Sequence, residues 1–198
     1  MIETVGIIGA GTMGNGIAQI CAAAGLNVTM VDISDAAVQR GLKTVGGSLD
    51  RLVSKEKMTA ADRDATLARI NATTDKSKLA ACDLVIEAAT ENEELKVKIL
   101  RDLCAGLKPS ALVATNTSSI SITRLAASTD RPDRFIGMHF FNPVPVMALL
   151  ELIRGLQTSD DTVAKAEAFA KRVGKVAITA KNSPGFAVNR ILCPMINE

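Results

Sequence analysis

The chain has 198 residues, 47% of them hydrophobic, and its 23 Lys and Arg nearly balance its 21 Asp and Glu. This length and apolar content allow one sizeable core and at most a fragment of a second domain. A net charge of +2, an aromatic content of 3% and the lack of Trp and Tyr argue against a nucleic-acid surface. The apolar fraction also excludes a disordered chain.

Cysteine and histidine usage argues against disulfides and metal binding. The four cysteines are Cys21, Cys82, Cys104 and Cys193, and none forms a C-x-x-C pair. We expect small buried thiols in a reducing compartment, and with one histidine we expect no metal site. Met1 directly precedes a strand-like run, and no apolar stretch approaches the roughly 20 residues that span a bilayer. We therefore expect a cytoplasmic protein without a membrane partner.

Short strand-like runs alternate with longer helical runs along the chain. In chain order, the pattern predicts a strand over 5–8, a turn over 9–14, a helix over 17–24, a strand over 28–31, and helices over 35–54 and 60–68. It then predicts a strand over 83–88, a helix over 92–105, a strand over 111–114, a helix over 122–126, strands over 135–138 and 149–153, a helix over 160–172 and a strand over 176–179. This alternation predicts an α/β fold with a Rossmann-type, doubly wound, mainly parallel sheet.

The C-terminal segment breaks this alternation. Ser183-Pro184-Gly185 is typical of a helix start, and the apolar run 191–196 continues that helix until the sequence stops at Glu198. A lone helix with an apolar face needs a cover. We therefore expect one domain over 1–183, and over 184–198 the start of a truncated helical domain or a helix that docks on another subunit.

A glycine-rich motif follows the first predicted strand. The motif Gly9-Ala10-Gly11-Thr12-Met13-Gly14 fits G-x-G-x-x-G, opens a helix and lies within a βαβ unit. Asp32 ends the second strand, where a carboxylate can accept the ribose hydroxyls of NAD and repel a 2′-phosphate. Its alternative role is to cap the next helix. No Arg follows it at once, so NAD is favoured over NADP.

His139 is the candidate base for proton transfer. It ends a predicted strand in Met138-His139-Phe140-Phe141-Asn142-Pro143-Val144-Pro145, and ligands of open α/β sheets bind outside the carboxyl ends of strands. Glu151 interrupts an apolar run, where an unpaired buried carboxylate would cost several kcal/mol. A histidine partner would relieve that cost and fix the tautomer. The alternative is that Glu151 faces solvent from a sheet edge.

Three polar segments have two interpretations each. In Thr115-Asn116-Thr117-Ser118-Ser119 the hydroxyls suit a substrate oxygen, and Ser118 or Ser119 also suits a helix cap. Thr90-Glu91-Asn92-Glu93 is similar to a capping box. Lys43, Arg51, Lys55 and Lys57 form a basic set, either a solvated face or a cradle for a phosphorylated substrate tail.

Together these residues resemble the 3-hydroxyacyl-CoA dehydrogenase family over the whole chain. The resemblance lies in the H-F-F-N-P-V-P run, the N-T-S-S segment and the P-G-F-x-x-N-R motif around Asn189. It implies an NAD-dependent oxidoreductase that interconverts (S)-3-hydroxyacyl-CoA and 3-ketoacyl-CoA, with short chains favoured. Members carry a helical C-terminal domain that forms a homodimer and closes the cleft, and only its first helix is present here.

The resemblance also implies residue roles. His139 would be the general acid/base with Glu151 as its partner, and Ser118 and Asn189 would polarise the reacting oxygen. The implied cofactor contacts beyond the glycine motif and Asp32 are Glu91, Lys96, Asn116 and Asn142. The implied contacts to the CoA moiety are Ser48 and Lys55.

Two other functions fit the same residues. A related NAD-dependent dehydrogenase of a free hydroxy acid or sugar acid would use the same His–Glu pair, and it would not need a CoA tail on its substrate. A non-catalytic NAD-binding or structural protein would bind NADH without turnover.

Overall fold

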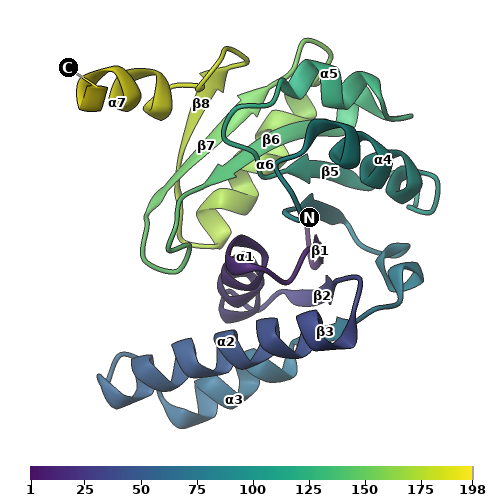
Figure 1. The fold of residues 1–198 in the computed structure, drawn as a ribbon. Coiled ribbons are helices and arrows are strands. Elements are labelled where there is room, and N and C mark those ends of the chain that lie inside the picture. Colours follow the sequence, from purple (N-terminus) through teal and green to yellow (C-terminus); the bar gives the residue numbers. More distant parts are fainter. Residues whose placement is uncertain (198) are drawn as a thin grey trace.

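The computed structural model of the protein describes residues 1–197, which build an eight-stranded sheet with helices on both faces (Figure 1). The strands are β1 (Thr4–Ile8), β2 (Asn27–Val31), β3 (Ile70–Thr73), β4 (Leu84–Glu87), β5 (Leu112–Thr115), β6 (Phe135–Phe140), β7 (Leu149–Arg154) and β8 (Val176–Lys181). The α-helices are α1 (Thr12–Ala23), α2 (Asp35–Ser54), α3 (Ala60–Ala68), α4 (Glu93–Cys104), α5 (Ile122–Ala127), α6 (Asp160–Arg172) and α7 (Val188–Asn197). Short 3-10 helices cover Lys76–Leu79 and Pro132–Arg134.

The strand order is β3-β2-β1-β4-β5-β6-β7-β8, and all neighbours pair in parallel except β6 and β7. The predicted Rossmann-type, mainly parallel sheet is therefore confirmed. The order reverses between β1 and β4, which is the position where open α/β sheets bind their ligands. The carboxyl ends of β1, β4, β5 and β6 lie at the same edge of the sheet.

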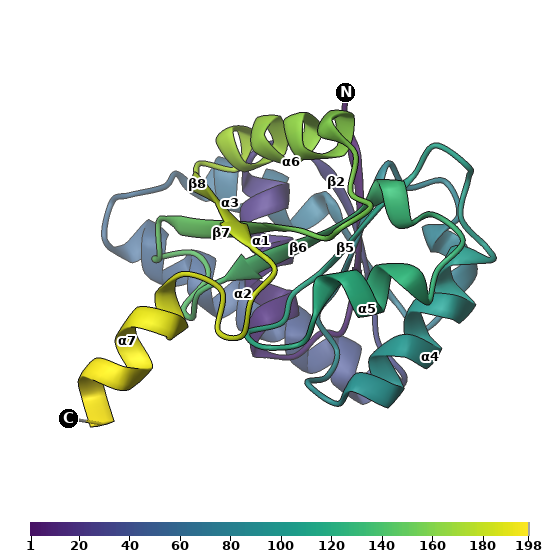
Figure 2. The same cartoon turned by 90° about the horizontal axis from the view of Figure 1, so that it is seen from above.

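Alternation of side chains along the strands divides the core into two layers. Ile7 packs in the layer that contains α1 and α6, and Ile8 packs in the layer that contains α4 and α5. Figure 2 shows α6 on one side of the sheet and α4 and α5 on the other. Both faces of the central strands are covered, which explains their continuous apolar runs.

Two further parts complete the fold: a helical arm, whose buried residues join the layer of α1 and α6, and helix α7. Helices α2 and α3 run side by side as a helical arm (Figure 1), and four residues of α2 (Val38, Gly41, Val45 and Leu49) are buried. Helix α7 extends away from the sheet in both views, and none of its described residues is buried. No helix in the described part of the chain combines the length and the apolar character needed to cross a membrane.

Several sequence predictions need correction. Strand β3 was not predicted, because Ile-Asn-Ala-Thr contains one strongly apolar residue and pairs only at a sheet edge. Helix α7 begins at Val188 rather than at Ser183, because Gly185 and Phe186 have φ values of 74° and 51°, which lie outside the helical region. Cys21, Cys82 and Cys104 are buried as predicted, whereas Cys193 is exposed.

Candidate functional site

The glycine-rich turn between β1 and α1 has no room for side chains at two positions. Gly9 has a φ of +100°, and a Cβ there would lie 2.7 Å from the carbonyl oxygen of Ala88. A Cβ on Gly14 would lie 1.8 Å from the carbonyl oxygen of Gly9. A Cβ on Gly11, in contrast, would meet nothing within 4 Å. The turn is therefore closed toward the protein and open on the side where a ligand would approach its backbone.

The N-terminus of α1 suits a pyrophosphate. No side chain caps it at Gly11, and its first turn contains no acidic residue. Its free N–H groups and the helix dipole favour an anion at that point. The hollow in front of it is lined by residues of the glycine turn, the end of β2 and α2, namely Ala10, Gly11, Thr12, Asn15, Asp32, Ile33, Ser34, Ala37, Arg40, Gly41 and Thr44.

Asp32 lies in this hollow and accepts hydrogen bonds from the N–H groups of Ala10 and Ile33, both at 2.7 Å. It does not cap α2, because Ser34 does so by accepting from the N–H of Ala37. Each carboxylate oxygen keeps a further lone pair for a ribose hydroxyl. The open Gly11, the uncapped helix end and the fixed carboxylate together fit NAD.

His139 and Glu151 form a buried pair. They lie opposite each other in the antiparallel register of β6 and β7, so their side chains share one face. Nδ1 of His139 lies 2.6 Å from Oε2 of Glu151, and Glu151 is fully buried. The alternative that Glu151 faces solvent is therefore wrong, and β8 covers the edge of β7. Strand β6 extends one residue past His139, which still lies near its carboxyl end.

Glu151 also holds the start of α7. Its other oxygen, Oε1, accepts from the N–H groups of Ala187 and Val188 at 3.0 and 2.9 Å. One carboxylate thus connects the imidazole of His139 to the helix that carries Asn189. The ring of Phe186, which precedes α7, packs edge-on against the imidazole of His139, with 5.8 Å between the ring centroids. Phe186 adopts a positive φ, a conformation that non-glycine residues rarely adopt outside functional or strained segments.

Glu91 accepts hydrogen bonds from the hydroxyl groups of the segment that follows β5. Its Oε1 accepts from Thr117 Oγ1 at 2.6 Å, from Ser118 N at 2.9 Å and from Ser118 Oγ at 3.2 Å. Burial alone would raise the pKa of Glu91, but these hydrogen bonds and the charge of Lys96 hold it below its usual value. The Glu91 side chain, 47% exposed, remains open to a ligand.

A helix does start in the segment 90–93, with Glu93 in the first turn of α4, but its cap differs from the predicted one. Neither Ser118 nor Ser119 caps a helix. Asn92 caps α4 by accepting from the N–H of Leu95, so Thr90 is not the cap. Ser121 caps α5 by accepting from the N–H of Arg124. Ser118 and Ser119 instead direct their hydroxyls toward Glu91.

Lys96 is fully buried, and its ammonium donates inside the protein. Its partners are Glu87 Oε2 at 2.6 Å, Asn116 O at 3.2 Å and Thr115 Oγ1 at 3.3 Å, while Glu91 lies at 4.0 Å. An ammonium has three donors. Lys96 therefore supports the end of β5 and the charge of Glu91, and its three donors point away from solvent.

Glu87 and Thr115 belong to this cluster. Glu87 was not predicted, and the Thr115 hydroxyl, predicted to suit a substrate oxygen, is bonded to Lys96 and Glu87 instead. Glu87 ends β4, is fully buried and accepts from Thr115 Oγ1 at 2.7 Å. The sequence does contain a signal for Glu87. This carboxylate directly follows the apolar run Leu84-Val85-Ile86, just as Glu151 interrupts another apolar run, and a buried carboxylate needs a partner.

Of the remaining predicted site residues, Asn116 contacts the cluster around Lys96, and the other four lie apart from it. Asn116 is tied to β6, because its Oδ1 accepts from the N–H of Phe140 at 3.0 Å. Asn142 is exposed in the loop after β6, and Asn189 is half-buried in the first turn of α7. Ser48 and Lys55 lie on the helical arm, with Lys55 exposed at the C-terminal end of α2. Within residues 1–197, the hydrogen bonds do not connect these last four residues to the His139–Glu151 pair.

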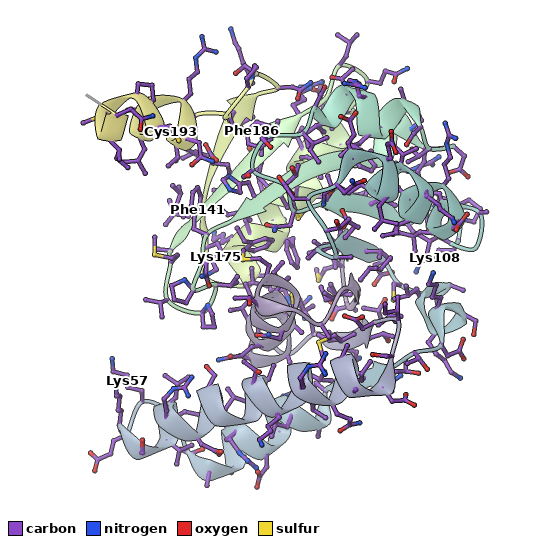
Figure 3. All side chains as sticks on the ribbon, in the orientation of Figure 1. Lys57, Lys108, Phe141, Lys175, Phe186 and Cys193 are labelled. Atoms are coloured by element: carbon purple, nitrogen blue, oxygen red, sulfur yellow. The ribbon has the colours of Figure 1, made fainter. Side chains whose placement is uncertain are left out.

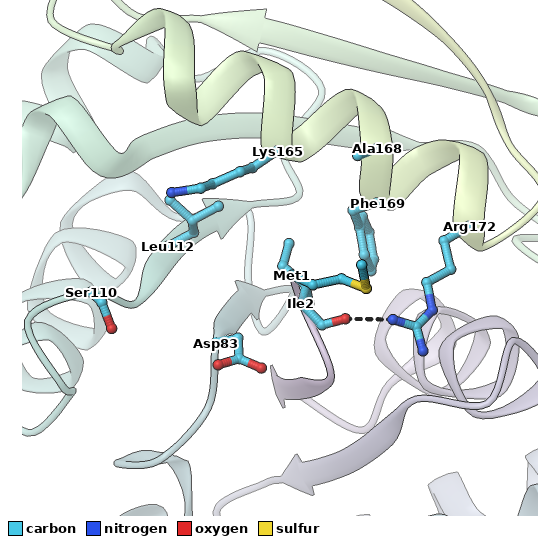
Figure 4. Close-up of a pocket in the computed structure, with 9 residues that line it drawn as sticks. All are labelled: Met1, Ile2, Asp83, Ser110, Leu112, Lys165, Ala168, Phe169 and Arg172. Atoms are coloured by element: carbon cyan, nitrogen blue, oxygen red, sulfur yellow. Dashed lines mark hydrogen bonds between the residues drawn. The ribbon is translucent and has the colours of Figure 1, made fainter.

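A different hollow lies at the amino-end edge of the sheet (Figure 4). Its charged side chains are paired: Arg172 binds Glu3 and the carbonyl oxygen of Ile2, Lys165 binds Asp161, and Asp83 binds Lys108. In the part of the chain that the structure describes, no group of three or more His, Cys, Asp or Glu side chains could hold a metal ion. The chemistry-bearing residues gather at the carboxyl-end edge instead.

Comparison with known proteins agrees with this arrangement. Residues 4–183 match the family described as 3-hydroxyacyl-CoA dehydrogenase, NAD binding domain. The chain is 54% identical to a 3-hydroxybutyryl-CoA dehydrogenase of Bradyrhizobium diazoefficiens over all 198 residues, which cover 68% of that protein. It is 43% identical to the fatty acid oxidation complex subunit alpha of Acinetobacter baylyi, over 98% of the chain and 27% of that protein. The crystal structure of (S)-3-hydroxybutyryl-CoA dehydrogenase from Ralstonia eutropha superposes with a TM-score of 0.98 at 68% identity, over 100% of this chain and 70% of that one.

Proposed function

Because the chain belongs to the 3-hydroxyacyl-CoA dehydrogenase family, we propose that it oxidises (S)-3-hydroxybutyryl-CoA to acetoacetyl-CoA and catalyses the reverse reduction. Membership in this family confirms the resemblance noted in the sequence, the cofactor NAD and the oxidoreductase class. The short acyl chain is inferred from the names of the Bradyrhizobium and Ralstonia relatives. The observation that carries the proposal is the His139–Glu151 pair at the same sheet edge as the glycine turn.

His139 is the proposed general acid/base. Glu151 faces Nδ1, so Nδ1 carries the hydrogen and Nε2 keeps its lone pair free for the substrate hydroxyl. In oxidation, Nε2 takes the hydroxyl proton while the C3–O bond becomes a carbonyl, and Glu151 stabilises the imidazolium. In reduction, the imidazolium returns that proton to the forming alkoxide. When bound, NAD+ would supply the acceptor for the hydride that leaves C3 with both electrons of its bond.

The other predicted residues complete the proposed site. Ser118 and Asn189 would polarise the reacting oxygen. Glu91, Asn116 and Asn142 would contact the cofactor together with the glycine turn, and Lys96 would act through Glu91 and Asn116, because it is buried beneath them. Ser48 and Lys55 on the helical arm would bind the CoA moiety.

We further infer a cytoplasmic homodimer with an acyl-CoA substrate. The support for the dimer is the exposed apolar side of α7, formed by Ile191, Leu192, Met195 and Ile196. The domain boundary near residue 183 is part of the same proposal, because the NAD-binding family match ends there and α7 begins just beyond it.

The test is NADH oxidation, followed at 340 nm, with acetoacetyl-CoA and with free acetoacetate. We expect turnover of the CoA ester only, and His139→Ala should lower that turnover by about 10²–10⁴-fold, the contribution typical of a positioned acid/base. NADH affinity of this variant should stay close to wild type, because His139 does not lie in the dinucleotide hollow. A large loss of NADH affinity, or equal turnover of free acetoacetate, would contradict the proposal.

A further inference from the structure

The loop that joins β6 to β7, residues 141–148, connects several parts of the site. It starts two residues after His139, carries Asn142 and leads into the strand of Glu151. Val144, 2% exposed, packs on α1 at Gly16, where a Cβ would lie 2.8 Å from Val144 Cβ. The position of this loop therefore sets the distance and orientation of Asn142 relative to α1, the helix that begins at the glycine turn.

Lys175 also holds this loop. It lies in the turn between α6 and β8, and its Nζ donates to the carbonyl oxygens of Val144 at 2.5 Å and Met147 at 2.6 Å. The next residue along, Val176, donates its N–H to Ala148 O at 2.9 Å. Lys175 and Phe141, which opens the loop, are both labelled in Figure 3.

The choice of partners sets Lys175 apart from other lysines of the chain. Lys108 and Lys165 form ion pairs with Asp83 and Asp161. The ammonium of Lys175 instead donates hydrogen bonds to two main-chain carbonyl oxygens. It is half-buried, and this burial lowers its pKa. Taking an ammonium partly out of water is unfavourable unless strong acceptors replace that water. The two carbonyls of the loop are those acceptors.

We propose that Lys175 is a positioning residue for cofactor binding: it holds the 141–148 loop against α1 and thereby fixes Asn142 for its contact with the dinucleotide. This inference rests on the proposed function, since it takes Asn142 as a cofactor contact. Lys175 itself touches neither cofactor nor substrate. Its cation bridges the carbonyls of two loop residues that lie three positions apart in the sequence.

The experiment uses three variants of the chain. Lys175→Met removes the ammonium and keeps most of the side-chain volume, Lys175→Arg keeps a cationic donor, and Lys171→Met makes the same exchange at an exposed site on the last turn of α6. Hydrogen exchange is measured at the amides of Val146 and Met147, both of which donate to Pro143 O. NADH affinity is measured by fluorescence titration.

For Lys175→Met we expect exchange at these two amides to rise about tenfold and the Kd for NADH to rise about fivefold, the scale of losing charge-assisted hydrogen bonds that are partly exposed. Lys175→Arg should recover most of both values, and Lys171→Met should match wild type. Wild-type exchange in Lys175→Met would overturn the inference, as would faster exchange spread evenly over the whole sheet. If the wild-type chain bound no NADH, the proposed function would fail, and the exchange measurement would still decide the role of Lys175 in the loop.

Discussion

At the residue scale, the structure separates the three glycines of the turn by what each can tolerate. Gly14→Ala places a Cβ 1.8 Å from the carbonyl oxygen of Gly9, so the backbone must move. Gly11→Ala meets nothing within 4 Å, and the φ of −67° at this position suits any residue. The same glycine motif thus contains one position required by the fold and one position left open.

We expect Gly11→Ala to keep the free energy of unfolding within about 0.5 kcal/mol of wild type and to weaken NADH binding at least about tenfold, because its methyl group occupies the pyrophosphate side. Gly14→Ala should lower the free energy of unfolding by several kcal/mol. Urea denaturation and NADH titration of both variants check this. Wild-type NADH affinity in Gly11→Ala would mean that the cofactor does not approach this turn.

Carboxylates in apolar runs could be recognised from sequence, and so could the histidine partner of Glu151, but the partners of Glu87 could not. The pattern singled out Glu151, and the register of β6 and β7 explains why His139 is its partner. Glu87 has the same pattern, but its partner Lys96 comes from a helix and Thr115 from a neighbouring strand. Which charges meet in a buried cluster depends on strand order, which one sequence does not contain.

At the element scale, α7 depends on a single carboxylate for its N-terminal cap. Glu151 accepts from the N–H groups of Ala187 and Val188, which the helix itself leaves without partners. Glu151→Ala should therefore free the start of α7 and raise hydrogen exchange at these amides by about 5- to 30-fold, corresponding to about 1–2 kcal/mol for a lost cap. His139→Ala leaves this cap in place and serves as the matched control.

The two variants separate the two roles of Glu151. If both raise exchange at Ala187 and Val188 equally, the cap depends on the intact His139–Glu151 pair rather than on the carboxylate alone. If only Glu151→Ala does so, the catalytic pair and the helix that carries Asn189 are joined through one side chain. Asn189 would then move with any change at Glu151, and activity lost in Glu151→Ala would combine a catalytic and a positional effect.

Elements with a clear period or a cap were predictable. The bounds of α2, α3 and α6 match the prediction, because each begins directly after a Ser or Thr cap, at Ser34, Thr59 and Ser159. Strand β3 was not predicted because half of its residues are polar. Helix α7 starts later in the sequence than predicted because Phe186 adopts a left-handed backbone conformation, which is not expected for a phenylalanine.

At the scale of the whole molecule, the alternation of strands and helices predicted the parallel Rossmann-type strands. It did not predict that β7 pairs antiparallel to β6. A hairpin between β6 and β7 was not predicted, yet it is this pairing that places His139 opposite Glu151. The parallel strands bring the glycine turn and His139 to one edge, and the antiparallel pair supplies the acid/base partner there.

Asp83 stabilises the amino-end edge of the sheet, opposite the edge that carries the glycine turn and His139. Its carboxylate accepts from Glu3 N, Thr4 N, Thr4 Oγ1 and Lys108 Nζ, at distances from 2.6 to 2.9 Å. Burial would raise the pKa of Asp83, but the ammonium of Lys108 and these N–H groups hold it well below its usual range. The first residues of β1 are thus joined to β4 and to the segment before β5 through one charge.

Because the pKa of Asp83 is lowered in the folded state, its contribution is present above the unfolded pKa of about 4 and is lost as the pH falls below that value. Asp83→Asn should lower the free energy of unfolding by about 1–2 kcal/mol at pH 7, a range reduced for partial exposure. The gap to wild type should narrow steadily from pH 5 to pH 2. Asp102→Asn, an exposed change on α4, should show little gap at any pH. Urea denaturation of the three proteins at pH 7, 5 and 3 measures this, and a gap for Asp83→Asn that stays constant over that range would mean that shape rather than charge at Asp83 holds this edge together.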